Sequence, residues 1–481
     1  MKISKKVAMV VFCFTICAAV FAQEDGENTV ENAPVFAQED EGNAAKSEEK
    51  TAKVELKLDI PVFDVPYQTD ANMNQSLKLT TGVYSSMHYG LKKMYDGLNF
   101  TPFWNDAIYY SATAAGILAF AYVLPFGYPW TAHEYTHSIL SRNGIHGINN
   151  DYRFIDRGGI TGIYDDELAN FKRKAPYDFI RMNSASNEAY NLFSDALIRN
   201  YFYYEPDDLS WVSALIATWI SRSETGSAAF INYDLKSEPI AATLADVEAI
   251  LEEWYKNDGV QENRSLAGFE MLNWGYELFH PNEPYAARGL HPSGDGSVAR
   301  YIRFNQFSDD EMNYLVKHSY LSLLNYVSPL LLGFSSFPLG NSGLRGNFAL
   351  RHYLTSFGTD ISASVFLKKK PFNMAFTYHS YQNYNNYFPA IEADLVDYPF
   401  NIGNLEMFLS PRVLIGMQPK DQVFKTDSPE FLGLFGLRVD FKVHKNIFLY
   451  FDFTVKTDGW VAGNEYLDAN ASVKLGVSLR F

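Results

Sequence analysis

The sequence predicts an α+β, multi-domain protein in which a mainly helical domain precedes an antiparallel β-barrel of about eight strands. Apolar residues between about 75 and 340 recur with the 3.6-residue period of helices, whereas after about residue 345 the period is two. The last eleven residues alternate strictly, with Ala, Val, Leu and Phe on one face and small or charged residues on the other. A chain of 481 residues is long enough for two or three domains.

The composition excludes two broad classes of protein. Hydrophobic residues make up 47% of the chain and aromatic residues 16%, so most of the chain can form a packed core and is not disordered. The formal net charge is −16. Nucleic-acid binding needs a basic face, so an acidic chain of this kind is predicted not to bind nucleic acid.

The N-terminal residues predict export. Residues 1–22 combine Lys2, Lys5 and Lys6 with a following apolar run and small residues at the cleavage positions, as a secretory signal peptide does. Residues 23–56 are acidic, polar and without apolar periodicity, which predicts a disordered linker. Both cysteines, Cys13 and Cys17, lie in the signal, so the mature chain is expected to have no disulfide and no cysteine ligand for a metal.

Residues 57–344 form the predicted helical domain. The stretch from Ile108 to Leu124 carries no charge and is long enough to raise the question of a membrane span, but we interpret it as a buried or membrane-contacting core helix. Four further helices are expected at 176–203, 210–221, 244–255 and 308–324. The many Gly, Pro and Asn residues of 258–307 predict a long loop region.

Residues 345–481 form the predicted barrel. The expected strands are 347–356, 361–368, 372–378, 387–395, 405–417, 437–443, 447–456 and 471–481. The terminal Phe481, on the apolar face of its strand, resembles the end of bacterial outer-membrane proteins, and short turns interleave with longer connections. The resemblance implies contact with outer-membrane lipid and a helical domain on the periplasmic side. An inner-membrane location, or a soluble barrel or sandwich, is the alternative.

The chemistry of the chain is expected at His133-Glu134-Tyr135-Thr136-His137. Two histidines four residues apart on a helix project from the same face, one turn apart, so both imidazoles can reach one Zn²⁺. Glu134 lies next to them around the helix and is the candidate catalytic base for a metal-activated water. The alternative is an amphipathic helix with two solvated histidines.

This motif resembles that of the zincin metallopeptidases. In the gluzincin branch a glutamate on a later helix, often within Asn-Glu-x-x-Ala, is the third zinc ligand. The resemblance implies that Glu188, within Asn187-Glu188-Ala189-Tyr190-Asn191, has this role, although Asn191 stands where alanine is usual. Asp195, on the same helical face, is a weaker candidate for orienting a ligand histidine.

The leading hypothesis is therefore a zinc-dependent peptidase of the cell envelope that acts on a peptide or protein substrate, with the oligomeric state left open. A second hypothesis is a non-catalytic outer-membrane protein, such as an adhesin, scaffold or assembly factor, with a metal-binding or degenerate domain. The motif is also similar to that of site-2-type intramembrane proteases. Those need an aspartate in a later hydrophobic segment, and none follows in the segment around Asn325 to Pro329.

Overall fold

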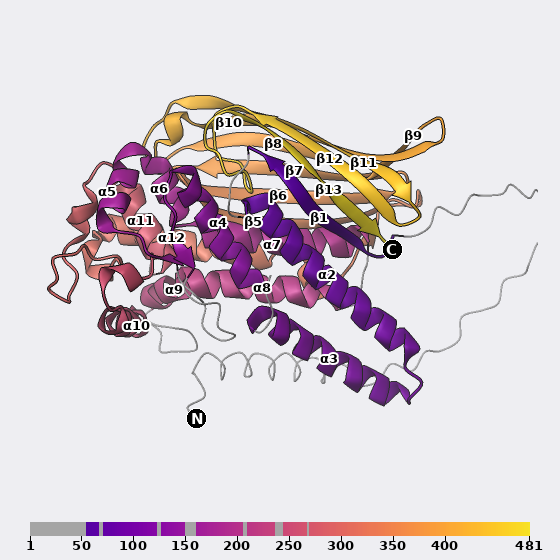
Figure 1. Ribbon diagram of the computed structural model, residues 1–481, viewed down its shortest axis with the longest axis horizontal. Helices are drawn as coiled ribbons and strands as arrows, with labels where there is room; N and C mark the ends of the chain where they lie inside the picture. Colours follow the sequence, from indigo (N-terminus) through magenta and orange to yellow (C-terminus); the bar gives the residue numbers. More distant parts are fainter. Residues whose placement is uncertain are drawn as a thin grey trace, which may run out of the picture. The chain divides into compact units, whose positions relative to one another are not determined.

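A broad antiparallel sheet with helices against one of its faces organises the chain (Figure 1). The computed structural model describes residues 54–66, 71–122, 127–149, 160–204, 209–235, 244–266 and 269–481. These residues belong to a single unit, residues 53–481. The predicted signal peptide, 1–22, and nearly all of the predicted linker, 23–56, lie outside the described residues.

The large sheet has the strand order β1-β13-β12-β11-β10-β8-β7-β6-β5-β4, and β9 pairs with β10 beside this path. A two-stranded sheet, β2-β3, lies apart from it. The strands are β1 (Lys57–Val65), β2 (Ile148–Asn149), β3 (Ile160–Thr161), β4 (Phe337–Pro338), β5 (Arg345–Thr355), β6 (Gly358–Lys369), β7 (Phe372–Gln382), β8 (Tyr387–Val396), β9 (Tyr398–Ile402), β10 (Leu405–Pro419), β11 (Pro429–His444), β12 (Ile447–Lys456) and β13 (Asn470–Arg480).

The helices precede most of these strands in the sequence. They are α2 (Met73–Gly97), α3 (Pro102–Tyr122), α4 (Tyr128–Arg142), α5 (Asp165–Lys174), α6 (Pro176–Met182), α7 (Ala185–Tyr203), α8 (Ser210–Thr225), α9 (Ser227–Leu235), α10 (Leu244–Asn257), α11 (Glu270–Phe279) and α12 (Asp309–Leu321). Short 3₁₀ turns are η1 (Gln261–Asn263), η2 (Tyr285–Arg288), η3 (Phe304–Gln306), η4 (Ser322–Tyr326), η5 (Pro329–Leu332) and η6 (Lys420–Gln422). In the described part of the chain, none of the helices combines the length and apolar character needed to traverse a bilayer.

Most of the predicted elements are present, with three differences. The helix predicted at 176–203 is divided into α6 and α7, because the Asn183 side chain donates to the Phe179 carbonyl oxygen (2.8 Å) and ends the first helix. Helix α11 lies inside the region predicted as a loop, and its Trp274 is fully buried. Strand β1 lies in the part predicted to be mainly helical, yet it pairs with the C-terminal strand β13.

The α+β class with a large antiparallel sheet is confirmed, but the prediction of a closed barrel is wrong. Strand β1 occupies one edge of the sheet, β4 and β5 occupy the other, and among the described residues no pairing joins these two edges.

The edge of β5 that faces away from β6 shows why the sheet stays open. The backbone N–H groups along this edge already have hydrogen-bond partners outside the sheet. The N–H of Leu350 donates to the Val327 carbonyl oxygen (2.9 Å), and the N–H of His352 donates to the Asn325 side-chain oxygen (2.6 Å). The next N–H on this edge, that of Leu354, donates to the side-chain oxygen of Asn187 on α7 (3.1 Å). An edge satisfied in this way does not require a pairing strand.

Helix α7 lies against the inner face of the sheet and is joined to it by apolar packing, as of Phe202 on Phe366 (ring centroids 5.9 Å apart), and by polar contacts. Arg199 forms an ion pair with Asp394 of β8 (3.0 Å), and the Tyr203 hydroxyl donates to the carbonyl oxygen of Met374 on β7 (2.7 Å). Tyr204, at the end of α7, donates to Asp397 (2.6 Å). The face of the sheet that the helices cover therefore carries polar and charged side chains, beside a buried apolar cluster that includes Phe388, Leu414 and Leu434.

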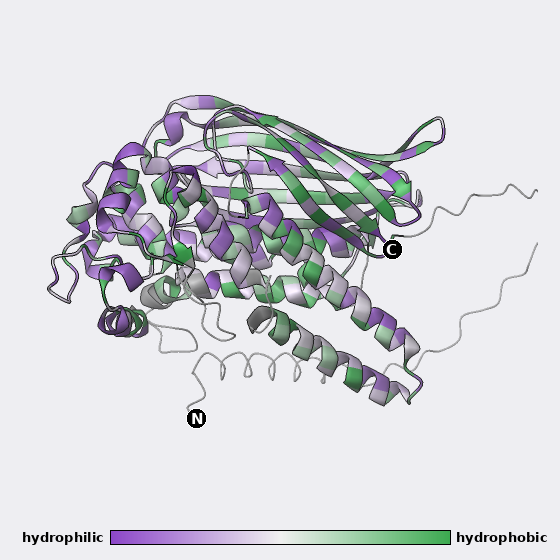
Figure 2. Ribbon diagram, viewed as in Figure 1, coloured by the Kyte–Doolittle hydropathy of each residue, from purple (hydrophilic) through white to green (hydrophobic). Residues whose placement is uncertain are grey.

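Charged side chains continue this polar character across the inner face. Arg438 of β11 binds Asp440 (2.7 Å) and Asp59 of β1, and Arg480 of β13 binds Asp397 (3.1 Å). Buried charges are tolerated when they are paired and hydrogen-bonded, as these are. Along the strands, hydrophilic and hydrophobic residues alternate (Figure 2), so the opposite face of the sheet carries the apolar side chains.

We expect Asn325→Ala to destabilise the protein, because it removes the acceptor for the buried N–H of His352 and a donor to the side-chain oxygen of Asn191 (3.1 Å). Leaving a buried donor unsatisfied costs about 1–3 kcal/mol. Denaturant-induced unfolding of the purified protein measures the change. The exposed Asn263→Ala serves as control and should change the free energy of unfolding by no more than about 0.5 kcal/mol. Equal effects for the two variants would contradict the edge-capping role.

Candidate metal centre

Helix α4 carries the predicted zinc-binding motif, and local sequence defines both of its ends. Pro129 lies in the first turn, after the N-cap Gly127, where the absent proline N–H costs nothing. At the other end Gly144 has φ +74°, and the N–H groups of Gly144 and Ile145 donate to the carbonyl oxygens of Ser141 (3.1 Å) and Leu140 (3.0 Å). This is a Schellman motif, which ends the helix at Gly144.

The two predicted histidine ligands lie side by side on α4. The ring centroids of His133 and His137 are 4.6 Å apart, and the rings are inclined by 61°. Their four-residue spacing on a helix brings them together. His137 is 3% exposed, and His133 is half-buried.

Glu134, the predicted catalytic base, is buried next to this pair, with 5% of its surface exposed. It follows His133 by about 100° around the helix. Burial of a carboxylate strengthens its electrostatic interactions and limits its contact with bulk water.

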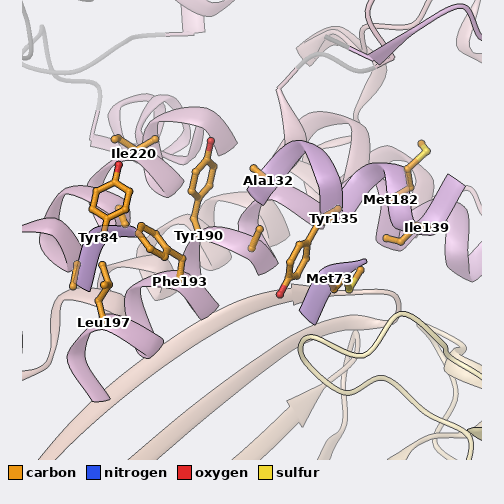
Figure 3. Close-up of a cluster of buried hydrophobic side chains, with 14 of the residues drawn as sticks. Met73, Tyr84, Ala132, Tyr135, Ile139, Met182, Tyr190, Phe193, Leu197 and Ile220 are labelled. Carbon is orange, nitrogen blue, oxygen red and sulfur yellow. The ribbon is translucent and has the colours of Figure 1, made fainter. Parts of the chain in front are cut away.

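The opposite side of α4 packs against α7 and α2 through small and aromatic residues (Figure 3). Tyr135 and Ile139 of α4 are buried in one cluster with Ala185 and Ala189 of α7, and these small residues permit the close approach of the two helices. Burial, together with the nearby Glu188 carboxylate, raises the pKa of the Tyr135 phenol well above its usual value. Tyr135 is therefore a neutral hydroxyl in this core.

Glu188, the predicted third ligand, lies at the start of α7 in a different arrangement. Its carboxylate accepts two hydrogen bonds from Arg181 of α6, at 2.7 and 3.1 Å. It also accepts hydrogen bonds from the Trp460 indole (3.3 Å) and the Gly463 N–H (2.8 Å), both in the connection between β12 and β13. The side chains of Arg181 and Glu188 are fully buried, so all four hydrogen bonds are shielded from water.

This arrangement places Glu188 on the Tyr135 side of α4. His133 and His137 each differ from Tyr135 by two residues, which is about 160° around a helix. The structure therefore does not bring Glu188 to the histidine pair. Among all residues that the structure describes, no group of three or more His, Cys, Asp or Glu side chains is arranged to hold a metal ion. The assignment of Glu188 as a zinc ligand remains a prediction that this geometry does not support.

Asp195, the predicted orienting residue, is also engaged elsewhere. It forms an ion pair with Arg199 one turn later on α7 (2.7 Å), and Arg199 continues to Asp394 of the sheet. The segment from Asn325 to Pro329, considered as the second element of an intramembrane protease, lies along the edge of β5. Asp195, through Arg199, and the segment from Asn325 to Pro329 therefore both take part in contacts with the large sheet.

Residues 457–469, between β12 and β13, hold the motif helix in place, and sequence reasoning did not identify this role. Glu465 accepts a hydrogen bond from the backbone N–H of Met73, the first residue of α2 (2.9 Å). The Arg142 guanidinium, at the end of α4, lies 3.7 Å from the centre of the Tyr466 ring. Gly463, which binds Glu188, has φ +77°, a backbone conformation that favours glycine. One connection thus contacts α2, α4 and α7 around the motif, and through the Val461 carbonyl oxygen also Arg181 of α6 (3.5 Å).

Comparison with known proteins gives no assignment: no family model matches the chain, and neither a curated protein nor a solved structure matches it. The site must therefore be interpreted from its own geometry.

We expect Glu188→Gln to lower the free energy of unfolding by about 3–5 kcal/mol, because it leaves the buried Arg181 without its counter-charge. Zinc content per chain should not change, since Glu188 lies across α4 from the histidines. Denaturant unfolding and elemental analysis measure these two quantities. Glu406→Gln is the matched control: its ion pair with Lys442 is about one-third exposed or more, so its loss should cost at most about 1 kcal/mol. Loss of zinc without loss of stability would instead identify Glu188 as a ligand.

Proposed function

We propose that this chain is a zinc-dependent peptidase-like hydrolase of the cell envelope, in which His133 and His137 hold the metal and Glu134 is the general base. One observation carries the proposal: two imidazoles with centroids 4.6 Å apart lie on the same helix as the buried Glu134.

The histidine pair suits a shared zinc ion. With zinc–nitrogen distances of about 2.0–2.1 Å in a tetrahedral site, two ligand nitrogens lie roughly 3.3 Å apart. Rings whose centroids are 4.6 Å apart can reach this separation by rotation of their side chains. No movement of the helix backbone is required, because the helix already places the two rings together.

The residues of α4 divide the proposed reaction between them. Zinc, when bound, would lower the pKa of a water molecule towards about 7 and polarise the carbonyl group under attack. Glu134 would accept the proton of the attacking water and return it to the leaving amine. Its position directly after a ligand histidine keeps it near the reacting water without making it a ligand.

A catalytic zinc also needs a third protein ligand, and Glu188 is committed to Arg181, Trp460 and Gly463. This observation favours a second candidate function. Under this second function the protein is a non-catalytic scaffold, adhesin or assembly factor of the envelope. Its motif helix either binds a metal without catalysis or binds no metal. The two candidates differ in whether Glu134 has a chemical role.

Both candidate functions include export of the protein from the cytoplasm. The proposed signal peptide is residues 1–22, and the proposed site of action is the outer membrane, with the motif helix on its periplasmic side. The alternative location is the inner membrane, as an intramembrane protease would require. Separation of the two membranes followed by immunodetection of the full-length chain distinguishes these locations.

We expect purified protein to contain about one zinc ion per chain and Glu134→Gln to retain it while losing hydrolysis of a quenched fluorescent peptide library. Loss of a general base lowers the rate roughly 10²- to 10⁴-fold. His133→Ala should lose the zinc as well as the activity. Glu253→Gln, at an exposed position on α10, is the matched control and should leave both unchanged. If the Glu134→Gln protein binds zinc and its hydrolysis is unchanged from wild type, the result would support the non-catalytic candidate function.

A further inference from the structure

The outer face of the sheet, opposite the helices, is apolar across nearly its whole width. One cross-strand row, fixed by the registers of the paired strands, runs over eight strands from β5 to β13. Every residue in it is apolar: Phe348, Val365, Phe376, Ala393, Val413, Phe435, Val455 and Ala471. We call the face that contains this row the outer face.

Many side chains of the outer face are exposed, although Met407 of β10 is buried. Val365 is 46% exposed and Phe435 43%, and in the neighbouring row Ile391 reaches 61% and Ile415 56%. Soluble monomers seldom expose a continuous apolar patch of more than about 300–600 Å². Eight strands about 4.8 Å apart and roughly 30 Å long cover about 1,000 Å². A face of this size needs a non-aqueous neighbour.

The open face of this sheet has the opposite polarity to the open face of a soluble sheet. In a soluble protein the face that packs against helices is apolar and the open face is polar. Here the helix-covered face carries the ion-paired Arg438, Asp440 and Arg480 beside a buried apolar cluster, while the open face carries the apolar row. Apolar outward and polar inward is the pattern of sheets that contact lipid.

The height of the outer face fits the hydrocarbon layer of a bilayer. On β10 every second residue from Leu405 to Met417 is apolar. Twelve residue steps of about 3.4 Å give an apolar length of roughly 41 Å along the strand. At the strand tilt of about 45° usual for membrane sheets this becomes roughly 29 Å, close to the ~25–30 Å of the hydrocarbon core.

The strand ends carry the residues expected where hydrocarbon meets the polar head groups. Phe372 begins β7 at one end of the sheet and Tyr387 begins β8 at the other, and they are 52% and 64% exposed. Aromatic residues gather at such interfaces. Beyond Phe372 the turn contains the exposed Lys369 and Lys370, and the corresponding turn between β11 and β12 contains Lys445.

We propose that the outer face of this open sheet contacts the hydrocarbon core of a lipid bilayer, with the helices covering its polar inner face. A second copy of the chain suits the face less well. Protein interfaces form about one hydrogen bond per 100–200 Å², and the cross-strand row has no side chain that could form one. The inference does not depend on zinc or on the proposed peptidase activity.

The test uses the full chain with Cys13 and Cys17 replaced by alanine and a single cysteine introduced for an environment-sensitive fluorophore. Ile391→Cys reports on the outer face, and Leu449→Cys, at a position 51% exposed on β12, repeats the measurement if the first variant does not fold. Val260→Cys is the matched control, because Val260 is also 61% exposed but lies next to η1, outside the large sheet.

In vesicles of dioleoylphosphatidylcholine, the labels at 391 and 449 should lose at least half of their emission when the acyl chains are brominated, and the label at 260 should not. Absence of quenching at both sheet positions overturns the proposal. Unquenched labels together with disulfide cross-linking between copies through Ile391→Cys would assign the face to a second copy. Zinc content, measured on the same samples, tests the proposed hydrolase separately.

Discussion

The buried ion pair between Arg181 and Glu188 connects the helices of this protein to its sheet. Arg181 lies at the end of α6 and Glu188 near the start of α7, while the two other donors to Glu188 come from the connection between β12 and β13. Because both charges are fully buried, neither can be removed without leaving the other uncompensated. The interaction therefore fixes where α7, and the helix α4 that packs on it, lie relative to the strands.

The same connection orders the surroundings of the motif helix. Glu465 binds the first N–H of α2, and Tyr466 stacks against Arg142 at the end of α4. The helix that carries His133 and His137 is thus held at its C-terminal end by the connection between β12 and β13 and along its length by α7. A metal-binding pair needs a rigid support of this kind, since small rotations of a helix would separate its imidazoles from further ligands.

Polar contacts on the inner face and apolar residues on the outer face are two consequences of one strand pattern. Strict alternation sends charged residues such as Arg438 and Asp440 towards the helices and residues such as Phe435 and Val413 away from them. The helices then supply counter-charges, as Arg199 does for Asp394. The edge of β5, satisfied by Asn187 and Asn325, keeps this two-faced sheet open.

The sequence by itself determined what depends on neighbours in the chain. Three such local features are present in the structure. They are the spacing of His133 and His137, the end of α4 at Gly144 and the alternation of the strands after residue 345. Tertiary structure alone decided whether the sheet closed, where β1 paired and what Glu188 bound. Its partner Trp460 is 272 positions away, and Asn187 reaches Leu354 across 167. Such contacts follow from packing and edge pairing between distant segments, and no local pattern of residues encodes them.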